Sequence, residues 1–273
     1  MSTAALRRHT VSVRFPTPTR PPGPVSVPPA WVAAAVLVWI PAVLVADRAV
    51  SATVQTLLGV GTWVLLVAIL AGQDGLVRAQ TAVVVVFATV VEYTFSGWLH
   101  VYVYRLHDVP AFVPPGHGLV YLAALALGGT ALVRSHARAA VAATVVAGAA
   151  YAAWGLSPLA PRPDVLGAFW FACLIGFLLW GPSRLLYVGA FVVVTCLELV
   201  GTSLHIWTWA PHDPTGLVAM GNPPSGAAGG YGWFDLAAVL VAPALLALLL
   251  RLRARRPLVA VPARTAEPVM SED

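Results

Sequence analysis

Two stretches of this chain carry nearly the same pattern of residues, and a duplicated sequence predicts a duplicated structure. They cover residues 92–121 and 198–231, and each begins with a glutamate in an apolar run, followed seven or eight residues later by a histidine. After that histidine the copies match without a gap, with two aromatic residues, a second histidine and an aspartate. The matched residues are His100, Tyr102, Tyr104, His107 and Asp108 in the first copy and His205, Trp207, Trp209, His212 and Asp213 in the second. We infer an internal duplication that contains most of the polar chemistry of the chain.

The composition places both copies in a membrane protein. Hydrophobic residues make up 59% of the chain, charged residues only 10%, and the mean hydropathy is +0.82, whereas a soluble domain carries about 25% charged residues. Every basic residue is an arginine, and together with abundant Ala, Val, Gly and Pro this is typical of a GC-rich bacterial genome. Cys173 and Cys196 lie in apolar segments, so no disulfide framework is expected.

Eight apolar segments are long enough to cross a hydrocarbon core of about 30 Å as helices. They cover residues 30–46, 52–72, 81–104, 117–134, 139–157, 165–181, 185–209 and 233–250. The sequence therefore predicts an all-α polytopic membrane protein with polar tails at residues 1–29 and 251–273. A cleaved signal peptide is an alternative for the first segment, but a polar leader of 29 residues is long for that role.

The arginines predict how these helices are oriented. With a cytosolic N-terminus, 13 arginines lie in cytosolic segments and only three, Arg48, Arg105 and Arg162, lie in outer loops, in agreement with the positive-inside rule. Both termini are then cytosolic, and both motif loops are extracytoplasmic at the plasma (inner) membrane. Residues 30–134 and 135–250 are expected to form two four-helix repeats related by an axis along the membrane normal. Anionic lipid accounts for the positive charge, so no nucleic-acid partner is expected.

Glu92 and Glu198 are the candidate catalytic groups. Each lies deep in an apolar segment, where a carboxylate costs at least about 2.5 kcal/mol, so two at equivalent positions suggest acid–base chemistry or ligand binding. On an α-helix His205 lies two turns from Glu198 on nearly the same face, whereas His100 is less well aligned with Glu92. Both histidines are expected to orient the glutamates or exchange protons with them. The alternative is that each glutamate is protonated and only bridges neighbouring helices.

The other polar and aromatic residues of the two copies, together with Asp235, are candidate substrate-binding groups towards the outer face. They are Tyr102, Tyr104, Arg105, His107, Asp108, His117, Trp207, Trp209, His212, Asp213, Asn222 and Asp235. The aromatic residues are expected mainly as an interfacial belt or as packing, with the lining of an apolar or cationic ligand site as the alternative. Histidine and carboxylate together suit Zn, Fe or Mn, but no HExxH or CxxC motif is present. The sequence therefore leaves open whether a metal or any other cofactor is bound.

These features favour a membrane-embedded enzyme that acts on an apolar lipid or isoprenoid-like substrate from the bilayer. Paired carboxyl groups in apolar surroundings suit hydration, isomerisation or cyclisation of an alkene. The sequence contains no nucleophile elbow, dinucleotide-binding glycine motif or phosphate-binding loop. A proton-coupled transporter or metal-handling protein is the second hypothesis, and a non-catalytic assembly subunit is the third. A closed cavity reached from lipid would favour the enzyme, and a polar path to the cytosolic face would favour the transporter.

Overall fold

The computed structural model describes residues 28–254, so the predicted tails lie almost entirely outside the described residues. The elements are α1 (Ala30–Asp47), α2 (Ala52–Ala71), α3 (Gly75–Glu92), the π-helix η1 (Tyr93–Trp98), β1 (Tyr102–Tyr104), α4 (Val113–Gly128), α5 (Ala131–Ser135), α6 (Ala137–Leu156), α7 (Val165–Trp180), α8 (Arg184–Ser203), β2 (Trp207–Trp209) and α9 (Ala227–Ala254). Within this part of the chain, six helices are long and apolar enough to cross a membrane: α1, α2, α3 with η1, α6, α8 and α9. α4 and α7 are also apolar but have 16 residues each. The fold is that of an all-α membrane protein.

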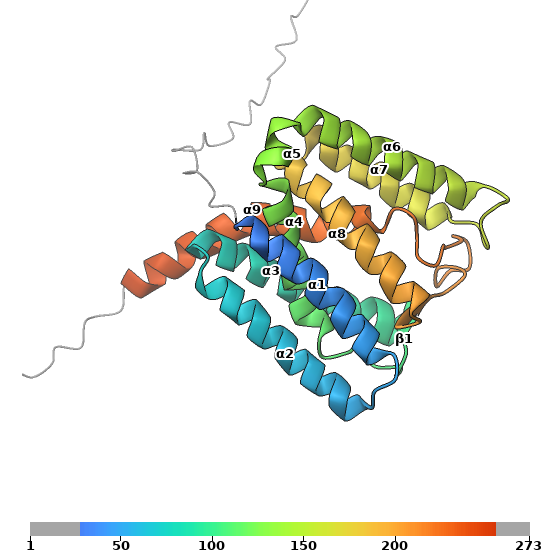
Figure 1. The fold of residues 1–273 in the computed structure, drawn as a ribbon, viewed down its shortest axis with the longest axis horizontal. Helices are drawn as coiled ribbons and strands as arrows, with labels where there is room; N and C mark the ends of the chain where they lie inside the picture. The colour runs from blue at the N-terminus through green and yellow to red at the C-terminus, as the bar shows by residue number, and fades with distance from the viewer. Residues whose placement is uncertain (1–27, 255–273) are drawn as a thin grey trace, which may run out of the picture.

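Four helices, α3, α4, α8 and α9, form a ring at the centre of the fold, in which each packs against two others. In this ring α3 lies diagonally opposite α8, and α4 lies opposite α9. α1 and α2 pack against α4, whereas α6 and α7 pack against α8 and α7 also against α9 (Figure 1). Such a ring directs side chains from all four helices towards one axis, which is where helix bundles place their binding sites.

The helices that carry the glutamates end earlier than the sequence predicts. α3 changes into η1 directly after Glu92, and α8 ends at Ser203. In each copy the histidine that follows has a positive φ, 51° at His100 and 57° at His205. This left-handed conformation is uncommon outside glycine and turns the chain away from the helix axis. The predicted helices over 81–104 and 185–209 are therefore wrong at their outer ends.

The motif aromatics lie on two short strands that pair with each other. β1 and β2 are antiparallel, with Tyr102 opposite Trp209 and Tyr104 opposite Trp207. Because side chains alternate along a strand, both aromatics of each strand point to the same side. Segments about 105 residues apart in the sequence thus form one small aromatic sheet across the ring.

Glycines allow the ring helices to approach closely. Gly128 of α4 lies against the carbonyl oxygen of Leu185 in α8, and Gly189 of α8 lies against the carbonyl oxygen of Ala124 in α4. Neither site has room for a Cβ atom. Small residues commonly allow backbone contact of this kind between membrane helices, and the two glycines make the α4–α8 contact reciprocal.

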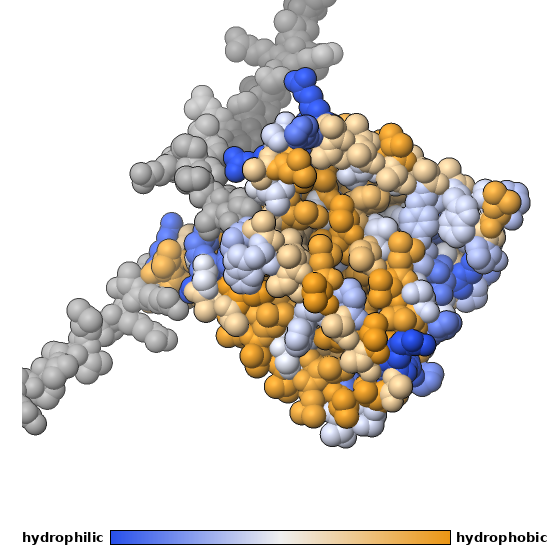
Figure 2. Space-filling model, in the orientation of Figure 1, coloured by the Kyte–Doolittle hydropathy of each residue, from blue (hydrophilic) through white to orange (hydrophobic). Residues whose placement is uncertain are grey.

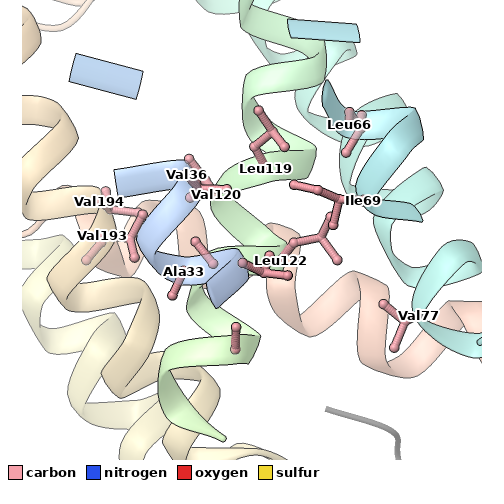
Figure 3. Close-up of a cluster of buried hydrophobic side chains, with 14 of the residues drawn as sticks. Ala33, Val36, Leu66, Ile69, Val77, Leu119, Val120, Leu122, Val193 and Val194 are labelled. Atoms are coloured by element: carbon pink, nitrogen blue, oxygen red, sulfur yellow. The ribbon is translucent and has the colours of Figure 1, made fainter. Parts of the chain in front are cut away.

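The largest buried apolar cluster surrounds α4. Figure 3 shows Leu119 and Val120 of α4 between side chains of α1, α2 and α8, including Val36, Leu66 and Val193. Each of these five residues is at most 4% exposed. This packing fixes the position of α4 and therefore of the polar residue His117 that precedes the cluster in the same helix.

The outer faces of the helices are apolar. Figure 2 shows hydrophobic residues across the face formed by α1, α2 and α8, with hydrophilic residues towards the helix ends and loops. Val38 of α1 and Val64 of α2, for example, are 72% and 63% exposed. Apolar side chains at this density are typical of a surface in contact with lipid.

Four predicted segments, 30–46, 52–72, 139–157 and 165–181, match α1, α2, α6 and α7 to within two residues. α4 and α9 begin several residues before the predicted 117 and 233. The prolines before His117 occupy the first turn of α4, where proline is well tolerated because its missing N–H would have no helical partner. These shifts place His117 and Tyr231 inside helices, facing the interior of the ring.

Candidate functional site

A cavity of about 430 Å³ lies in the ring at the end that carries the strands. Both glutamates line it, although they come from opposite helices. Most of the remaining wall is aromatic and aliphatic, with rings contributed by α1, α3, η1, β1, α7, β2 and α9. An apolar pocket with a few convergent polar groups is the usual form of a ligand site.

Glu92 is held by three hydrogen-bond partners. Its Oε2 accepts hydrogen bonds from the hydroxyl groups of Tyr102, at 2.9 Å, and Tyr104, at 2.8 Å. Its Oε1 lies 2.8 Å from Nε2 of His117 in α4. His117 is 5% exposed, so a proton on its ring would balance the charge of Glu92 inside the protein.

Glu198 occupies the corresponding place on α8 but has different partners. Its Oε2 accepts hydrogen bonds from the indole N–H groups of Trp207, at 3.0 Å, and Trp209, at 3.1 Å. No hydrogen bond or cationic side chain reaches its Oε1 from residues 28–254. Because Glu198 lines the cavity, Oε1 is the oxygen that a ligand can meet. The two carboxyl groups share a scaffold and differ in chemistry.

The strand tyrosines act as hydrogen-bond donors. Burial, and then the neighbouring carboxyl group of Glu92, raises the pKa of Tyr102 and of Tyr104 well above the ordinary value, which is about 10. Both phenols therefore keep their protons at neutral pH. The predicted interfacial belt is wrong for the four strand aromatics, which are each at most 7% exposed and line the cavity.

A buried aspartate and a nearby arginine hold the segments next to the cavity in place. Asp164 accepts hydrogen bonds from the backbone N–H groups of Gly221, at 2.8 Å, and Ser225, at 2.6 Å. Arg162 donates to the backbone carbonyl oxygens of Trp209 and Gly221 at 2.9 and 2.8 Å. Together these bonds attach β2 and the segment before α9 to the start of α7.

Two predicted substrate-binding residues also contact the protein itself. Arg105 donates to the carbonyl oxygen of Val50 at 2.9 Å and lies 3.4 Å from Oδ1 of Asp47, which is fully buried. The side-chain oxygen of Asn222 accepts a hydrogen bond from the backbone N–H of Trp209 at 2.9 Å. Both residues therefore stabilise the position of the strands.

The predicted catalytic histidines do not reach the carboxyl groups. His100 and His205 are exposed, and Nδ1 of His100 lies 3.0 Å from the carbonyl oxygen of Ser96. Their expected place on the helical face of the glutamates is wrong, because both helices end before them. The histidine that meets a glutamate is His117, which the sequence placed among the substrate-binding groups.

The other predicted loop residues lie outside the cavity. His107, Asp108 and His212 are exposed. Asp213 accepts hydrogen bonds from the hydroxyl group of Thr215 and from nearby backbone N–H groups, which lower its pKa and hold its own loop. Asp235 is buried in α9, four residues beyond Tyr231, and is not part of the cavity wall.

Several aromatic wall residues were missed in the sequence, among them Trp39, Trp170 and Tyr231. Trp39 of α1 and Trp170 of α7 lie outside the duplicated pattern, and Trp170 packs edge-on against Trp209 with ring centroids 5.6 Å apart. Tyr231 stacks on His117 with centroids 5.1 Å apart. Only Tyr231 had a sequence signal, since it closes the second copy.

Within residues 28–254, no three His, Cys, Asp or Glu side chains lie together in a way that could hold a metal ion. Cys173 and Cys196 are free thiols. The site is therefore described by its two carboxyl groups, one histidine and the aromatic wall. Comparison with protein-family models, with curated proteins and with solved structures gave no significant match to this chain.

Proposed function

We propose that this chain is an integral membrane enzyme that protonates a carbon–carbon double bond in an apolar lipid or isoprenoid-like substrate. One observation carries the proposal: two carboxyl groups from equivalent helices, each held by its own strand, line one aromatic cavity. A general acid and a general base on either side of an apolar substrate are what proton transfer to and from carbon requires.

The different partners of the glutamates suggest their roles. Glu198 has one oxygen free towards the cavity and no cation beside it, which suits the neutral acid that donates a proton. Its O–H bond breaks as a C–H bond forms at one alkene carbon, and the other carbon becomes a cation. Glu92 with His117 then accepts a proton, either from the neighbouring carbon, which gives an isomerised alkene, or from a water that has added to the cation. Attack by a second double bond of the substrate, followed by the same proton loss, gives a ring.

The aromatic wall suits the cationic intermediate. Ring faces attract cations, most strongly when water is excluded, and a site that is polarised in advance stabilises developing charge most effectively. Trp207, Trp209 and Trp170 line the same cavity as the strand tyrosines. These rings stabilise a positive charge without supplying a nucleophile that would trap it.

The cavity wall also reaches the outer surface of the helices. Phe87 of α3, Phe95 of η1 and Trp233 of α9 line the cavity and are 38%, 37% and 50% exposed. α3 and α9 pack against each other, so these residues lie along one seam. Entry at this seam from the bilayer supports an apolar substrate, and the π-helical turn that contains Phe95 widens the helix there.

We also infer that the chain spans the membrane eight times as two four-helix repeats, α1–α4 and α6–α9. The order of elements in the two halves is the same, with a strand before each last helix. In this repeat α3 corresponds to α8 and α4 to α9. The two contacts between the halves, α3–α9 and α4–α8, therefore join corresponding pairs of helices. Reporter fusions after Asp108 and Thr215 are expected on the extracytoplasmic side, and fusions after Gln73 and His136 in the cytosol. Opposite sides for the two motif loops would contradict the repeat.

The experiment for the enzymatic function follows solvent deuterium into the substrate. Membranes containing the protein are incubated in D₂O with a panel of isoprenoid alkenes and with lipid extract, and products are analysed by mass spectrometry. We expect uptake of one deuterium per product, with Glu198→Gln slowing it by about 10²–10⁴-fold while the variant remains inserted. Tyr93→Phe, which changes a 57% exposed tyrosine on η1, is the matched control. Full activity in both Glu92→Gln and Glu198→Gln would refute the proposal.

A proton-coupled transporter is the second candidate, and the buried Asp235 favours it because this carboxyl group lies further along α9 than the cavity. In that case labelled substrate would cross sealed vesicles unchanged, and both Glu→Gln variants would stop the movement. Conversion without movement supports the enzyme. Neither conversion nor movement, with folded Glu→Gln variants that still restore a deletion strain, would leave the non-catalytic role.

A further inference from the structure

A second polar cluster lies in the same ring, beyond the cavity. Tyr121 of α4, Tyr187 of α8 and Asp235 of α9 are 1%, 0% and 4% exposed. Within the described residues, neither tyrosine hydroxyl nor Oδ2 of Asp235 has a hydrogen-bond partner. Tyr121 packs in one buried cluster with Leu186 of α8, which precedes Tyr187, and with Phe234 of α9, which precedes Asp235. Because buried polar groups are nearly always paired, three unpaired ones in one place indicate a missing partner such as water.

The cluster lies next to the part of the cavity wall that is formed by His117 and Tyr231. His117 of α4 stacks on Tyr231 of α9 at 5.1 Å between ring centroids. Tyr121 follows His117 by four residues, and Asp235 follows Tyr231 by four, so each lies one turn further on the same helical face. Nδ1 of His117 is also buried without a partner in residues 28–254. Unpaired groups therefore continue from His117 into the cluster.

The cluster extends towards the helix ends opposite the strands. Tyr187 lies in the first turn of α8, three residues after the exposed Arg184. From Glu198 to Tyr187 is 11 residues, or about 16 Å along the helix. The cluster therefore lies between the exposed start of α8 at Arg184 and the cavity.

We propose that Tyr121, Tyr187 and Asp235 enclose ordered water that passes protons between the aqueous phase at the start of α8 and His117. This inference rests on the proposed function, in which such a route returns the two carboxyl groups to their starting protonation states; the transporter would use the same route, and the vesicle assay above distinguishes the two functions. In isomerisation the proton leaves Glu198 and a different proton reaches the Glu92–His117 pair, so each turnover leaves one group short of a proton and the other with an extra one. Release of a proton from Nδ1 of His117 through the water, and uptake of another by Glu198, restores both groups without a further reactant. Tyr231, which stacks on His117, lines the same cavity as both glutamates.

Water fits this cluster better than a metal ion. A buried water needs two to four polar partners, and the two hydroxyl groups with Oδ2 of Asp235 supply three. The cluster contains one carboxyl group only, and the described residues form no set of three metal-binding side chains. The rings around it, such as Phe177 stacked on Tyr187 at 5.0 Å, exclude the rest of the solvent.

Melting temperature separates a wet cluster from a dry one. If the hydroxyl group of Tyr121 binds water, Tyr121→Phe removes a hydrogen bond, and we expect the melting temperature in detergent to fall. If the site is dry, the same change removes an unpaired polar group, and the melting temperature rises. Tyr187→Phe should behave in the same way. A rise for both variants would overturn the proposal, whereas Tyr93→Phe, at an exposed tyrosine on η1, is the control for loss of a tyrosine hydroxyl.

Infrared spectroscopy in nanodiscs tests the route itself. The carboxylic acid band of Asp235 is identified by its loss in Asp235→Asn, and its shift is followed after transfer from H₂O to D₂O. We expect exchange in the wild type at the first time point and at least tenfold slower exchange in Tyr187→Phe, with the exposed control Tyr93→Phe unchanged. Exchange that occurs only on unfolding, equal rates in the two tyrosine variants, or no acid band at all would each overturn the water route.

The two proposals fail separately. Unchanged exchange in Tyr187→Phe, with activity lost in Glu198→Gln, removes the water route and leaves the enzyme. Slowed exchange, with full activity in both Glu→Gln variants, removes the enzyme and shows a hydrated cluster that serves another purpose.

Discussion

Tyr102 and Trp209 face each other across the two-stranded sheet with ring centroids 4.5 Å apart, and they donate hydrogen bonds to different glutamates. The hydroxyl of Tyr102 reaches Glu92, and the indole N–H of Trp209 reaches Glu198. This ring contact connects the two carboxyl groups, which come from opposite helices of the ring, and the contact of Tyr104 with Trp207, at 6.1 Å between centroids, connects them a second time. Movement of either strand changes the geometry at both glutamates, so the site behaves as one unit.

The strand tyrosines should make stability fall at high pH. Burial, followed by Glu92, raises the pKa of Tyr102 and Tyr104 in the folded state, while an unfolded tyrosine ionises near pH 10. The stabilisation is complete below about pH 10 and is lost as the pH rises towards the folded-state pKa, because the unfolded chain releases protons first. The expected slope is about 1.4 kcal/mol per pH unit for each tyrosine.

Unfolding in detergent between pH 9 and 11 measures this slope. The double variant Tyr102→Phe/Tyr104→Phe should be less pH-dependent by about twice the single value. Tyr93→Phe, at an exposed tyrosine, should keep the slope of the wild type. Equal slopes in all three proteins would show that the strand phenols ionise as freely in the folded state as in the unfolded state.

Glu92 and His117 should be energetically coupled. They lie 2.8 Å apart and are both 5% exposed, so removing one partner leaves the other buried without its counter-charge. His117→Leu should cost about 3–5 kcal/mol, and the double variant with Glu92→Gln should cost less than the sum of the two single changes, by about 1–3 kcal/mol. A double-mutant cycle of unfolding free energies gives this coupling directly. If the changes in unfolding free energy of the two single variants add up to that of the double variant, Glu92 and His117 are not energetically coupled.

The sequence predicted several residues of the cavity wall better than it predicted the local structure around them. The gapless match of the two copies identified the four strand aromatics, and the glutamate before each match identified Glu92 and Glu198, because duplicated residues occupy equivalent places. It did not predict the strands, since aromatic residues in an apolar run suit a helix as well as a strand. The turn before each strand was also hidden, because the positive φ falls on His100 and His205 where glycine is the usual signal.

Contacts over long sequence distances account for the rest. Asp164 caps the start of α7, which a local pattern can indicate, but it also accepts loop hydrogen bonds from residues 57 and 61 positions away, which no local pattern marks. The predicted segment 117–134 began at His117, whereas the two prolines before this residue already belong to the first turn of α4. Packing between helices that are far apart in the sequence determines the positions of both residues, and no single segment of the sequence predicts that packing.

Close approach of α4 and α8 predicts a strong effect at a small residue. Gly189→Ala places a Cβ atom against the carbonyl oxygen of Ala124, and overpacking of this kind costs about 1–3 kcal/mol. Gly176→Ala in α7 meets only Trp180, at 4.0 Å, so it should be neutral or stabilise the helix by up to about 1 kcal/mol. Melting temperatures of the two variants in the same detergent provide the comparison. A Gly189→Ala protein as stable as Gly176→Ala would show that the helices separate easily.

His100 and His205 act either through their imidazole rings or through their backbone conformation, and substitutions distinguish the two. Both are exposed and have φ values of 51° and 57°, which glycine adopts without strain and a β-branched residue adopts poorly. If the turn is their function, His100→Gly and His205→Gly should keep stability and activity. His100→Val and His205→Val should each lose about 1–3 kcal/mol and disturb the strand that follows.

If the imidazole rings exchange protons with the site, the result is the reverse for activity. The glycine variants would then fold as well as the wild type and yet lose solvent-deuterium uptake, while each valine variant would be both unstable and inactive. Melting temperature and deuterium uptake measured on the same four membrane preparations separate the two cases. Active glycine variants would assign the histidines to the turn, and folded but inactive ones would restore them to the proton chemistry, through a path that bypasses the contacts of Glu92 and Glu198 seen in the cavity.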